Sequence, residues 1–179
     1  MKIEVSNSKA NRLLNTGNVI LVTSTFEGKS NIITLAWQTP LSKNPPLIGI
    51  CVGKNHYSHD IIKNSGEFVI NIPTVEILNK VHYCGTVSGK NEDKFKGAGL
   101  TPVPAKTINS PLIDECVGHI ECKIEKIYEI EHSSFFVGRA LRVLVDNELF
   151  NDYWLVDKVK TLHHLGGDNY TIPEKLINP

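Results

Sequence analysis

Two long stretches with a two-residue period, residues 119–131 and 135–145, constrain the fold of this chain most. In the first stretch, the apolar side chains expected on one face are Ile120, Cys122, Ile124, Tyr128 and Ile130. In the second stretch they are Phe135, Val137, Leu141, Val143 and Val145, and Arg139 alone interrupts the pattern. Such alternation is typical of antiparallel strands that bury one face and expose the other. The sequence therefore predicts two long, paired strands.

Shorter signals in the first half of the chain predict further strands. Residues 19–25 and 30–36 are rich in apolar and β-branched residues, and the turn sequence between them predicts a β-hairpin. Residues 47–52 follow two prolines, which end helices and favour an extended approach, so a third strand is expected there. Residues 67–72 predict a fourth strand.

The predicted helices are few and short. Residues 56–65 place Ser58 where it can cap a helix, and residues 75–83 carry apolar side chains at helical spacing. The proline-rich stretch 101–111 indicates a surface connection. Many strands, few helices and one core predict a mainly β fold with short helices (α+β), closed into an antiparallel barrel.

Length and charge limit the functions that we expect. A chain of 179 residues can bury one sizeable core, so a single domain over residues 1–179 is predicted. Lys and Arg number 19, as do Asp and Glu, so no global field attracts nucleic acid or an anionic membrane. The chain shows neither a signal peptide nor a long apolar run. We expect a soluble, cytoplasmic protein, in which any bound anion is held by a local site.

The cysteines and histidines do not follow a metal-site pattern. The four cysteines are scattered at positions 51, 84, 116 and 122, without a CxxC pair. His56 with His59, and His163 with His164, are close in sequence, but no cysteine or carboxylate accompanies them at a ligand spacing. Buried free thiols and no metal are therefore expected.

Three separated segments point to a cofactor: NIITLAW at 31–37, SGKNEDKF at 88–95 and HHLGG at 163–167. The second belongs to a longer run with the pattern C-G-x-x-S-G-x-x-x-D-K-F, which lacks the GxxxxGK[ST] spacing of a P-loop, so ATP or GTP hydrolysis is not supported. In this order, the segments resemble the flavin reductase-like family of FMN-binding split barrels, and within it the flavoredoxin-type proteins. The resemblance implies a Greek-key-like split β-barrel that binds FMN.

The resemblance places the flavin ring and ribityl chain along residues 31–37. It implies contacts from the side chains of Asn31 and Thr34 and from main-chain groups of Ala36 and Trp37, since a strand end offers N–H and C=O groups. The alternative is that Trp37 is a core aromatic residue. His164 is expected beside the ring, where a histidine can tune charge or assist proton movement; a purely structural role stays open.

One candidate phosphate site follows from residues 52–59, which begin with Val52. Gly53 permits close approach of the backbone, Lys54 brings positive charge, and Ser58 lies at a predicted helix start, where the dipole favours an anion. The alternative is that Ser58 only caps its helix and that Lys54 is a solvated surface charge.

The run that starts with Cys84 and Gly85 is the second candidate phosphate site. The resemblance implies that Ser88 and Lys94 contact the phosphate, a task that suits lysine as a flexible point charge. Asp93 is expected to hold the loop or to pair with Lys94.

A flavin supplies the redox chemistry, so no residue is predicted as an essential acid, base or nucleophile. The resemblance implies a homodimeric, flavin-dependent oxidoreductase that moves electrons between NAD(P)H or a redox-protein donor and the flavin. Two alternatives remain: an electron carrier without NAD(P)H turnover, and a non-catalytic FMN-binding module. The pyridoxamine phosphate oxidases fit less well, because their set of substrate-phosphate basic residues is not found.

Overall fold

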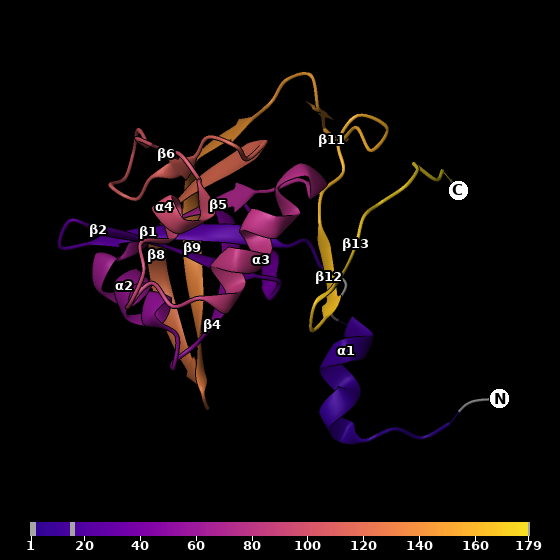
Figure 1. The fold of residues 1–179 in the computed structure, drawn as a ribbon, viewed down its shortest axis with the longest axis horizontal. Helices are drawn as coiled ribbons and strands as arrows, with labels where there is room; N and C mark the ends of the chain where they lie inside the picture. The colour runs from indigo at the N-terminus through magenta and orange to yellow at the C-terminus, as the bar shows by residue number, and fades with distance from the viewer. Residues whose placement is uncertain (1–2, 15–16, 179) are drawn as a thin grey trace.

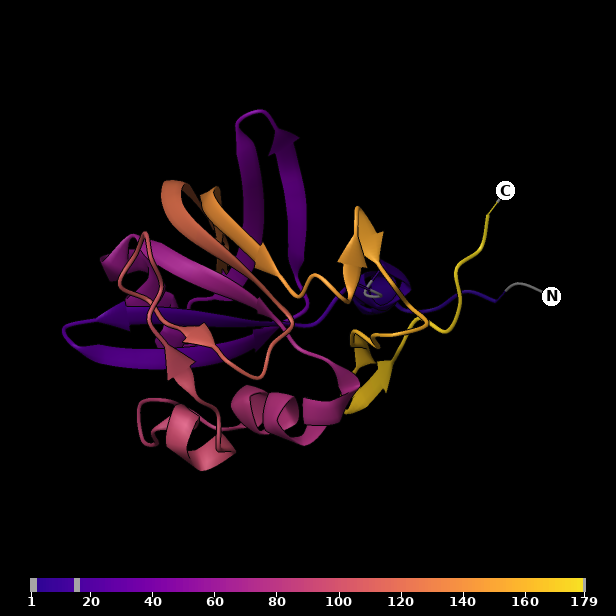
Figure 2. The same cartoon turned by 90° about the horizontal axis from the view of Figure 1, so that it is seen from above.

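A seven-stranded antiparallel sheet forms the centre of the molecule in the computed structural model, which describes residues 3–14 and 17–178 (Figure 1). The order across the sheet is β2-β1-β5-β8-β9-β4-β3. The strands are β1 (Ile20–Phe26), β2 (Lys29–Leu35), β3 (Gln38–Lys43), β4 (Pro46–Gly53), β5 (Glu67–Ile72), β8 (Gly118–Ile130) and β9 (Ser133–Val145). The sheet is curled, with β2 and β3 as its edges (Figure 2). The fold is mainly β with short helices, as predicted.

Short helices and two-stranded ribbons surround this sheet. The helices are η1 (Asn7–Lys9), α1 (Ala10–Leu14), α2 (Tyr57–Ser65), η2 (Val75–Ile77), α3 (Leu78–Thr86) and α4 (Lys94–Ala98). The ribbons are β6 (Pro102–Val103) with β7 (Leu112–Ile113), β10 (Phe150–Asn151) with β11 (Tyr153–Trp154), and β12 (His163–Gly166) with β13 (Asn169–Thr171). The predicted surface connection 101–111 therefore contains one strand of a small ribbon.

The first hairpin forms as the sequence predicts. β1 and β2 pair in register from Ile20 opposite Leu35 to Phe26 opposite Lys29. β3 was not predicted, because its sequence QTPLSK lacks β-branched alternation and contains a proline. An edge strand tolerates a proline, since one side of it makes no ladder hydrogen bonds.

Among the residues that the structure describes, the buried apolar side chains form two clusters rather than the single core that we expected. Ile20 and Val22 pack with Phe68 and Phe136 inside the barrel. Leu21 belongs to the other cluster, which includes side chains from α3 and α4. Successive residues of a strand point to opposite faces, so a hairpin covered on both faces contributes to two interiors.

β8 and β9 confirm the predicted pair of long strands, but their apolar faces are buried over only part of their length. The members that the structure leaves exposed are Tyr128, Ile130, Leu141, Val143 and Val145. Register shifts at Glu121/Cys122 and at Ile124/Lys126 interrupt the alternation, as β-bulges do. Strands of 13 residues are also roughly 43 Å long, which exceeds what the barrel interior can cover.

The two ends of the described chain lie on one side of the molecule. α1 and the β12–β13 ribbon are neighbours there, away from the β1–β2 hairpin tip (Figures 1 and 2). No helix among the described residues is long and apolar enough to cross a membrane.

Candidate functional site

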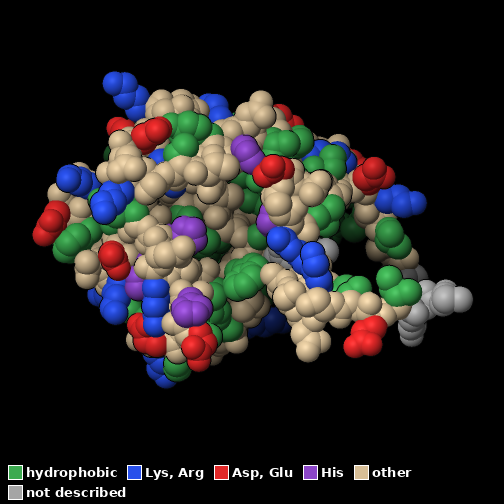
Figure 3. All heavy atoms as spheres, turned by 60° about the horizontal axis from the view of Figure 1, so that its bottom comes forward, with side chains coloured by type: hydrophobic (Ala, Val, Ile, Leu, Met, Phe, Trp, Pro, Cys, Tyr) green, Lys and Arg blue, Asp and Glu red, His purple; other side chains and the backbone are tan. Residues whose placement is uncertain are grey.

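Three adjoining pockets meet at the end of β2, where all of them are lined by Thr34 and Leu35. We call them the inner pocket, the mouth pocket and the histidine pocket. Figure 3 shows histidine side chains gathered around a hollow on one face of the molecule. The end of β2 thus leads into a branched cleft rather than onto a flat surface.

The inner pocket lies between the start of α2 and the loop that follows α3, and its volume is about 240 Å³. Residues 55–58 line it from one side and residues 84–89 from the other, with Lys94 among the lining residues. The two segments that the sequence singled out as phosphate sites therefore face the same pocket.

The start of α2 differs from the predicted cap. The N-cap residue is His56, without a side-chain hydrogen bond to the first turn. Ser58 is the second helical residue, and its hydroxyl oxygen accepts a hydrogen bond of 2.7 Å from Nδ2 of the buried Asn31. The expectation that Ser58 caps the helix is wrong, because the cap lies two residues earlier. Amide groups that no side chain caps at a helix start are suited to an anion.

Lys94 is 5% exposed and reaches the inner pocket from α4. Its Nζ donates to the carbonyl oxygens of Ile32 at 2.8 Å and of Cys84 at 2.7 Å. An ammonium group has three N–H donors, so one is left for a ligand. Burial lowers the pKa of Lys94. Burial also lowers the pKa of His56, and the charge of Lys94 lowers it further.

Asp93 holds the loop rather than pairing with Lys94. It is the N-cap of α4, and its Oδ1 accepts a hydrogen bond of 3.2 Å from the backbone N–H of Lys96. The sequence left open whether Asp93 holds the loop or pairs with Lys94. The ion pairs of the described residues include none between Asp93 and Lys94, so the first alternative applies.

Glycines allow the loop after α3 to approach β2 closely. A Cβ on Gly89 would lie 1.9 Å from Oδ1 of Asn31, and one on Gly85 would lie 3.4 Å from Cβ of Thr34. Ser88 is exposed on this loop, where its Oγ accepts from the backbone N–H of Lys90 at 3.3 Å. Ser88 lines the inner pocket beside the glycines.

Cys84 contributes through its backbone rather than through its thiol. The side chain is fully buried, and burial raises the pKa of the thiol to about 11, although the charge of Lys94 opposes that rise. A thiol with such a pKa stays protonated near neutral pH and is a poor nucleophile. All four cysteines are free; three are buried, whereas Cys51 is half-buried and lines the mouth pocket.

The mouth pocket has a volume of about 350 Å³ and opens beside Trp37. Trp37 is 49% exposed, so the interpretation of this residue as a core aromatic is wrong. Its carbonyl oxygen accepts a hydrogen bond of 2.9 Å from the N–H of Cys51, which ties the end of β2 to β4. Gly53 and His164 also line this pocket. Main-chain and aromatic groups of the predicted ring-binding segment are therefore accessible.

Three predicted residues line none of the three pockets. Asn31 is 4% exposed, and its side chain donates to Ser58. Val52 is fully buried in the barrel cluster. Lys54 pairs with Glu129, with Nζ and Oε2 2.6 Å apart, and lines none of the three pockets. Alternation explains the position of Val52, because Val52 and Gly53 point to opposite faces of β4 and only Gly53 borders the mouth pocket. Lys54 follows the strand, and its ammonium is held by Glu129.

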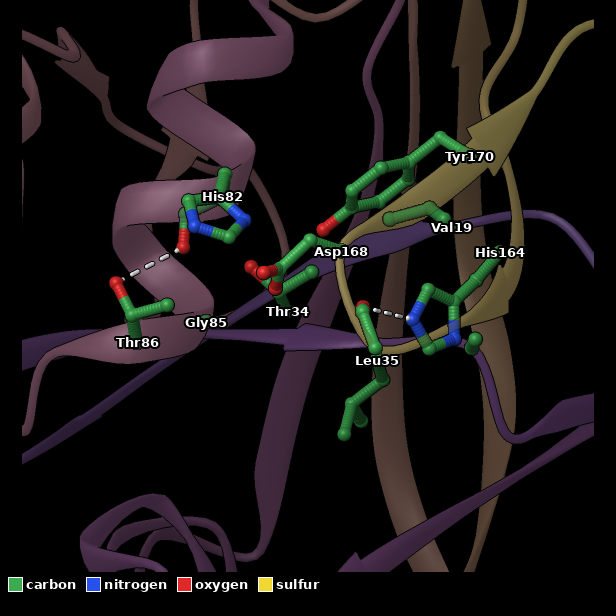
Figure 4. Close-up of a pocket in the computed structure, with 11 residues that line it drawn as sticks. Val19, Thr34, Leu35, His82, Gly85, Thr86, His164, Asp168 and Tyr170 are labelled. Carbon is green, nitrogen blue, oxygen red and sulfur yellow. Dashed lines mark hydrogen bonds between the residues drawn. The ribbon is translucent and has the colours of Figure 1, made fainter.

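The histidine pocket, of about 310 Å³, lies between α3 and the β12–β13 ribbon. Figure 4 shows His82, His164, Asp168 and Tyr170 around it. Nε2 of His164 lies 2.9 Å from the carbonyl oxygen of Gly167, and its ring centroid lies 5.4 Å from that of Tyr170. The ribbon thereby fixes the His164 ring where the histidine and mouth pockets meet.

Sequence reasoning missed several residues of the cleft, and His82 and Arg12 are the most polar examples from helices. His82 lines the histidine pocket from α3, and its only signal was its place just before the Cys84 run. Arg12 of α1 lines the mouth pocket, and a Cβ on Gly166 would lie 1.9 Å from its NH1 nitrogen. No local pattern marks Arg12, because it is distant in sequence from the other lining residues.

The cleft combines features that suit an elongated ligand with one anionic end. The inner pocket offers a lysine ammonium, a hydroxyl and the amides of a helix start. The other two pockets offer mixed polar and apolar surface, with the aromatic side chains of Tyr170 and Trp37 among their lining residues. The donor set of the inner pocket fits a phosphate group such as that of FMN.

Comparisons with known proteins show the family to which this chain is similar. A family model described as the flavin reductase like domain matches residues 12–165. A protein of Archaeoglobus fulgidus is 36% identical over 143 residues, which cover 80% of this chain and 81% of the relative. Flavoredoxin of Desulfovibrio vulgaris (Miyazaki F) is similar with a TM-score of 0.85 and 28% identity, covering 99% of this chain and 97% of that one. An FMN-binding domain of a flavin reductases-like enzyme from Shewanella baltica OS155 has a TM-score of 0.82 and 25% identity, with coverages of 98% and 95%.

Proposed function

Because this chain belongs to the flavin reductase-like family, we propose that it is an FMN-binding oxidoreductase that moves electrons between NAD(P)H, or a redox-protein donor, and the flavin. The similar structures include a flavoredoxin and an FMN-binding domain, which supports FMN as the cofactor. When bound, FMN supplies the ring that accepts and donates electrons. The chain itself binds and orients this group.

The observation that carries the proposal is the inner pocket. The ammonium of Lys94 keeps one donor free there, opposite amides at the start of α2 that no side chain caps. Ser88, Gly85 and the backbone of the same loop complete the wall. A phosphate held by a buried ammonium and a helix start has its charge neutralised locally. The chain has no net charge, so no overall field attracts a phosphate and a local site is needed.

The remaining cleft residues are proposed to orient the ring and ribityl chain. Thr34 lines all three pockets, although its hydroxyl donates to the carbonyl oxygen of Val81 at 2.7 Å, so its methyl group and backbone face a ligand. Ala36 and Trp37 continue the chain past the end of β2 into the mouth pocket. Asn31 acts through Ser58 and Gly89, which it holds in place.

The mouth pocket favours NAD(P)H as donor. Arg12 is one of its lining residues, and a guanidinium there can bind the phosphate of a dinucleotide. We expect Arg12→Ala to raise the KM for NAD(P)H while kcat changes little. The lost contact would stabilise the bound ground state and the transition state equally, so its loss weakens binding without slowing the chemical step. Lys9→Ala, an exposed change in the same segment, is the matched control.

Steady-state NAD(P)H oxidation with added FMN separates this function from its alternative. Robust turnover supports a reductase, whereas reduction of the bound flavin by a redox protein alone supports a flavoredoxin-type carrier. Failure of both donors to reduce bound FMN would leave a non-catalytic binding module.

The first test of the cofactor is the visible absorption spectrum of the purified protein, followed by release and identification of any flavin. Protein without flavin is then titrated with FMN by calorimetry. Saturable binding of one FMN per chain supports the proposal. A colourless protein that also fails to bind added FMN contradicts it.

We also propose a homodimer, as the resemblance implies. Leu141, Val143 and Val145 alternate along β9 and leave an exposed apolar stripe, with Val143 66% exposed. A second copy of the chain would remove this stripe from water, which is favourable in proportion to the apolar area buried.

A further inference from the structure

A chain of hydrogen bonds runs from the first turn of α2 to the β8–β9 hairpin. Nε2 of His59 lies 2.8 Å from Oγ of Ser134 on β9, and Nδ1 of the same ring lies 3.1 Å from Oδ1 of Asp60. His59 is 5% exposed, and Ser134 is fully buried. The function proposed above gives none of these three residues a role.

The directions of these hydrogen bonds make His59 the donor to Ser134. A serine hydroxyl carries one proton. The hydroxyl of Ser134 donates to Oε2 of Glu129 at 3.3 Å, so its oxygen accepts from Nε2 of His59. Glu129 is held in turn by Lys54, with Nζ and Oε2 2.6 Å apart, and by Lys63, with Nζ and Oε1 3.5 Å apart. Lys54, which lines none of the three pockets, is thereby connected to α2 through the hairpin.

His59 belongs to the turn that borders the inner pocket. Its backbone N–H donates to the carbonyl oxygen of His56 at 2.9 Å, which closes this turn. The two residues between them, Tyr57 and Ser58, line the inner pocket, whereas His59 lines none of the three pockets. A displacement of His59 would therefore displace the amides and the hydroxyl that face a phosphate.

Two strands hold consecutive residues of this turn. Asn31 of β2 donates to Oγ of Ser58 at 2.7 Å, and Ser134 of β9 lies at 2.8 Å from the ring of His59. All four side chains are buried. A buried polar group is costly to leave without its hydrogen bond, so these contacts fix the turn from both sides.

Two other roles fit these residues less well. Asp60, His59 and Ser134 follow the order of the acid, base and nucleophile of serine hydrolases. Ser134 is fully buried, however, and its hydroxyl donates to Glu129, so it is not presented to a substrate. A packing role alone needs the contact of the His59 ring with that of Phe136, at 5.5 Å between centroids, but neither of the polar contacts.

We infer that His59 is a positioning residue for the phosphate site: its hydrogen bond to Ser134 fixes the first turn of α2 in the orientation that binds the phosphate of FMN. This inference rests on the proposed function, because that function places the phosphate in the inner pocket. His59 acts through its neighbours in the turn and does not touch the ligand. Its loss therefore affects the phosphate end of the flavin more than the ring.

The test compares FMN with riboflavin, which has the same ring and ribityl chain but no phosphate. Flavin-free protein is titrated with each flavin by calorimetry. In His59→Asn, the amide takes the place of Nδ1 and leaves Ser134 without its donor. We expect the Kd for FMN to rise about tenfold, the loss of about one hydrogen bond, and the Kd for riboflavin to change less than about twofold.

Three further variants make this test specific to the hydrogen bond. His59→Gln can place an amide nitrogen where Nε2 lies, and it should restore FMN affinity to within about threefold of the wild type. Ser134→Ala removes the acceptor and should reproduce the loss in His59→Asn; it carries the test alone if His59→Asn does not fold. His132→Asn, an exposed change at the tip of the same hairpin, is the matched control and should change neither Kd. Thermal unfolding curves show which variants are folded.

The outcomes separate this inference from the proposed function. Selective loss of FMN affinity in His59→Asn and Ser134→Ala, with recovery in His59→Gln, supports the inference. It is overturned, and the proposed function stands, if both variants bind FMN as tightly as His132→Asn does or lose affinity for the two flavins by the same factor. A loss in His59→Gln as large as that in His59→Asn also overturns it. If the wild type does not bind FMN, both fail.

Discussion

At the scale of a single residue, Lys94 shows what the structure adds to a sequence motif. The D-K-F pattern identifies Lys94 as a candidate phosphate ligand. The structure shows that its ammonium donates to two carbonyl oxygens and that the residue lines the inner pocket. Burial lowers the pKa of Lys94 from its ordinary value of 10.5. Because only the protonated form attracts a phosphate, this shift sets the upper end of the pH range in which the site is charged.

We predict that Lys94→Met weakens FMN binding by about 10- to 100-fold, the loss expected for a charge-assisted hydrogen bond of about 1.5–3 kcal/mol. In the wild type, FMN affinity should fall as the pH rises through the lowered pKa of Lys94, below 10.5. The part of that fall caused by Lys94 should be absent from Lys94→Met. Calorimetric titrations across this pH range are the measurement.

Lys96→Met is the control for this prediction, because Lys96 is exposed and lies two residues away on the same helix. It should keep both the affinity and the pH dependence of the wild type. Equal FMN affinity in Lys94→Met and Lys96→Met would contradict the assignment of Lys94 to the phosphate.

Gly89 offers a second test at the same scale. A side chain there would collide with Asn31, so Gly89→Ala is expected to displace the loop, destabilise the protein by about 1–3 kcal/mol and weaken FMN binding. Asn31→Ala removes the colliding amide. In the double variant, the additional cost of Gly89→Ala should therefore shrink, as a double-mutant cycle of denaturant unfolding would measure. Additive costs would show that the two residues do not interact.

At the scale of an element, β8 shows a register shift next to a buried carboxylate, that of Glu121. The register shift after Glu121 leaves this carboxylate fully buried. It accepts hydrogen bonds from NH1 of Arg142 at 2.9 Å and from the N–H of Thr107 at 2.7 Å. Glu121 thereby attaches the loop of residues 104–110 to the sheet, which no sequence pattern indicated.

We predict that Glu121→Gln costs about 3 kcal/mol of unfolding free energy, because Arg142 is left with an uncompensated charge beside a buried site. Glu125→Gln, which removes a more exposed ion pair with Arg139 on the same strand, should cost less than about 1 kcal/mol. Thermal or denaturant unfolding of the two variants measures the difference. Similar costs would contradict the role assigned to Glu121.

The same carboxylate gives a dependence of stability on pH. Burial alone would raise the pKa of Glu121, but hydrogen bonds from Thr107 and Arg142 lower it to about 2, from 4.5. A lowered carboxyl pKa stabilises the folded state above the unfolded value, and this contribution is lost as the pH falls from about 4.5 toward 2. Glu121→Gln should lose less stability than the wild type over that interval.

At the scale of the whole molecule, the exposed stripe on β9 and the arm formed by α1 and the β12–β13 ribbon leave apolar surface that one chain does not cover. Leu13 and Leu14 on α1 are exposed, as are Val143 and its neighbours on β9. Exposed apolar surface of this kind is typical of contacts with another molecule. The homodimer proposed above would cover it with a second copy of the chain.

We predict that sedimentation velocity finds about twice the mass of one chain, and that Val143→Arg shifts the protein toward the monomer, because a charge in an apolar interface is costly. Glu27→Arg adds a cation at the exposed β1–β2 turn and serves as the control. A wild type that stays monomeric across micromolar concentrations would contradict the proposed dimer.

The sequence by itself determined the strands of the central sheet other than β3, and the ordered motifs. Alternation in residues 119–131 and 135–145, and β-branched residues on either side of a turn, are local signals, so β8, β9 and the first hairpin could be predicted. The run from Cys84 to Lys94 likewise named residues that line one pocket. Such features depend on residues that are close to one another in the chain, so they can be seen in the sequence alone.

Only the tertiary structure decided which of the named residues share the cleft. Lys54 turns to Glu129, Val52 enters the barrel interior, and Arg12 and His82 reach the pockets without a motif of their own. The register shifts in β8 and the second core cluster are likewise outcomes of packing between distant segments. Side-chain direction at a strand end depends on what lies across the fold, and that information is absent from any local pattern.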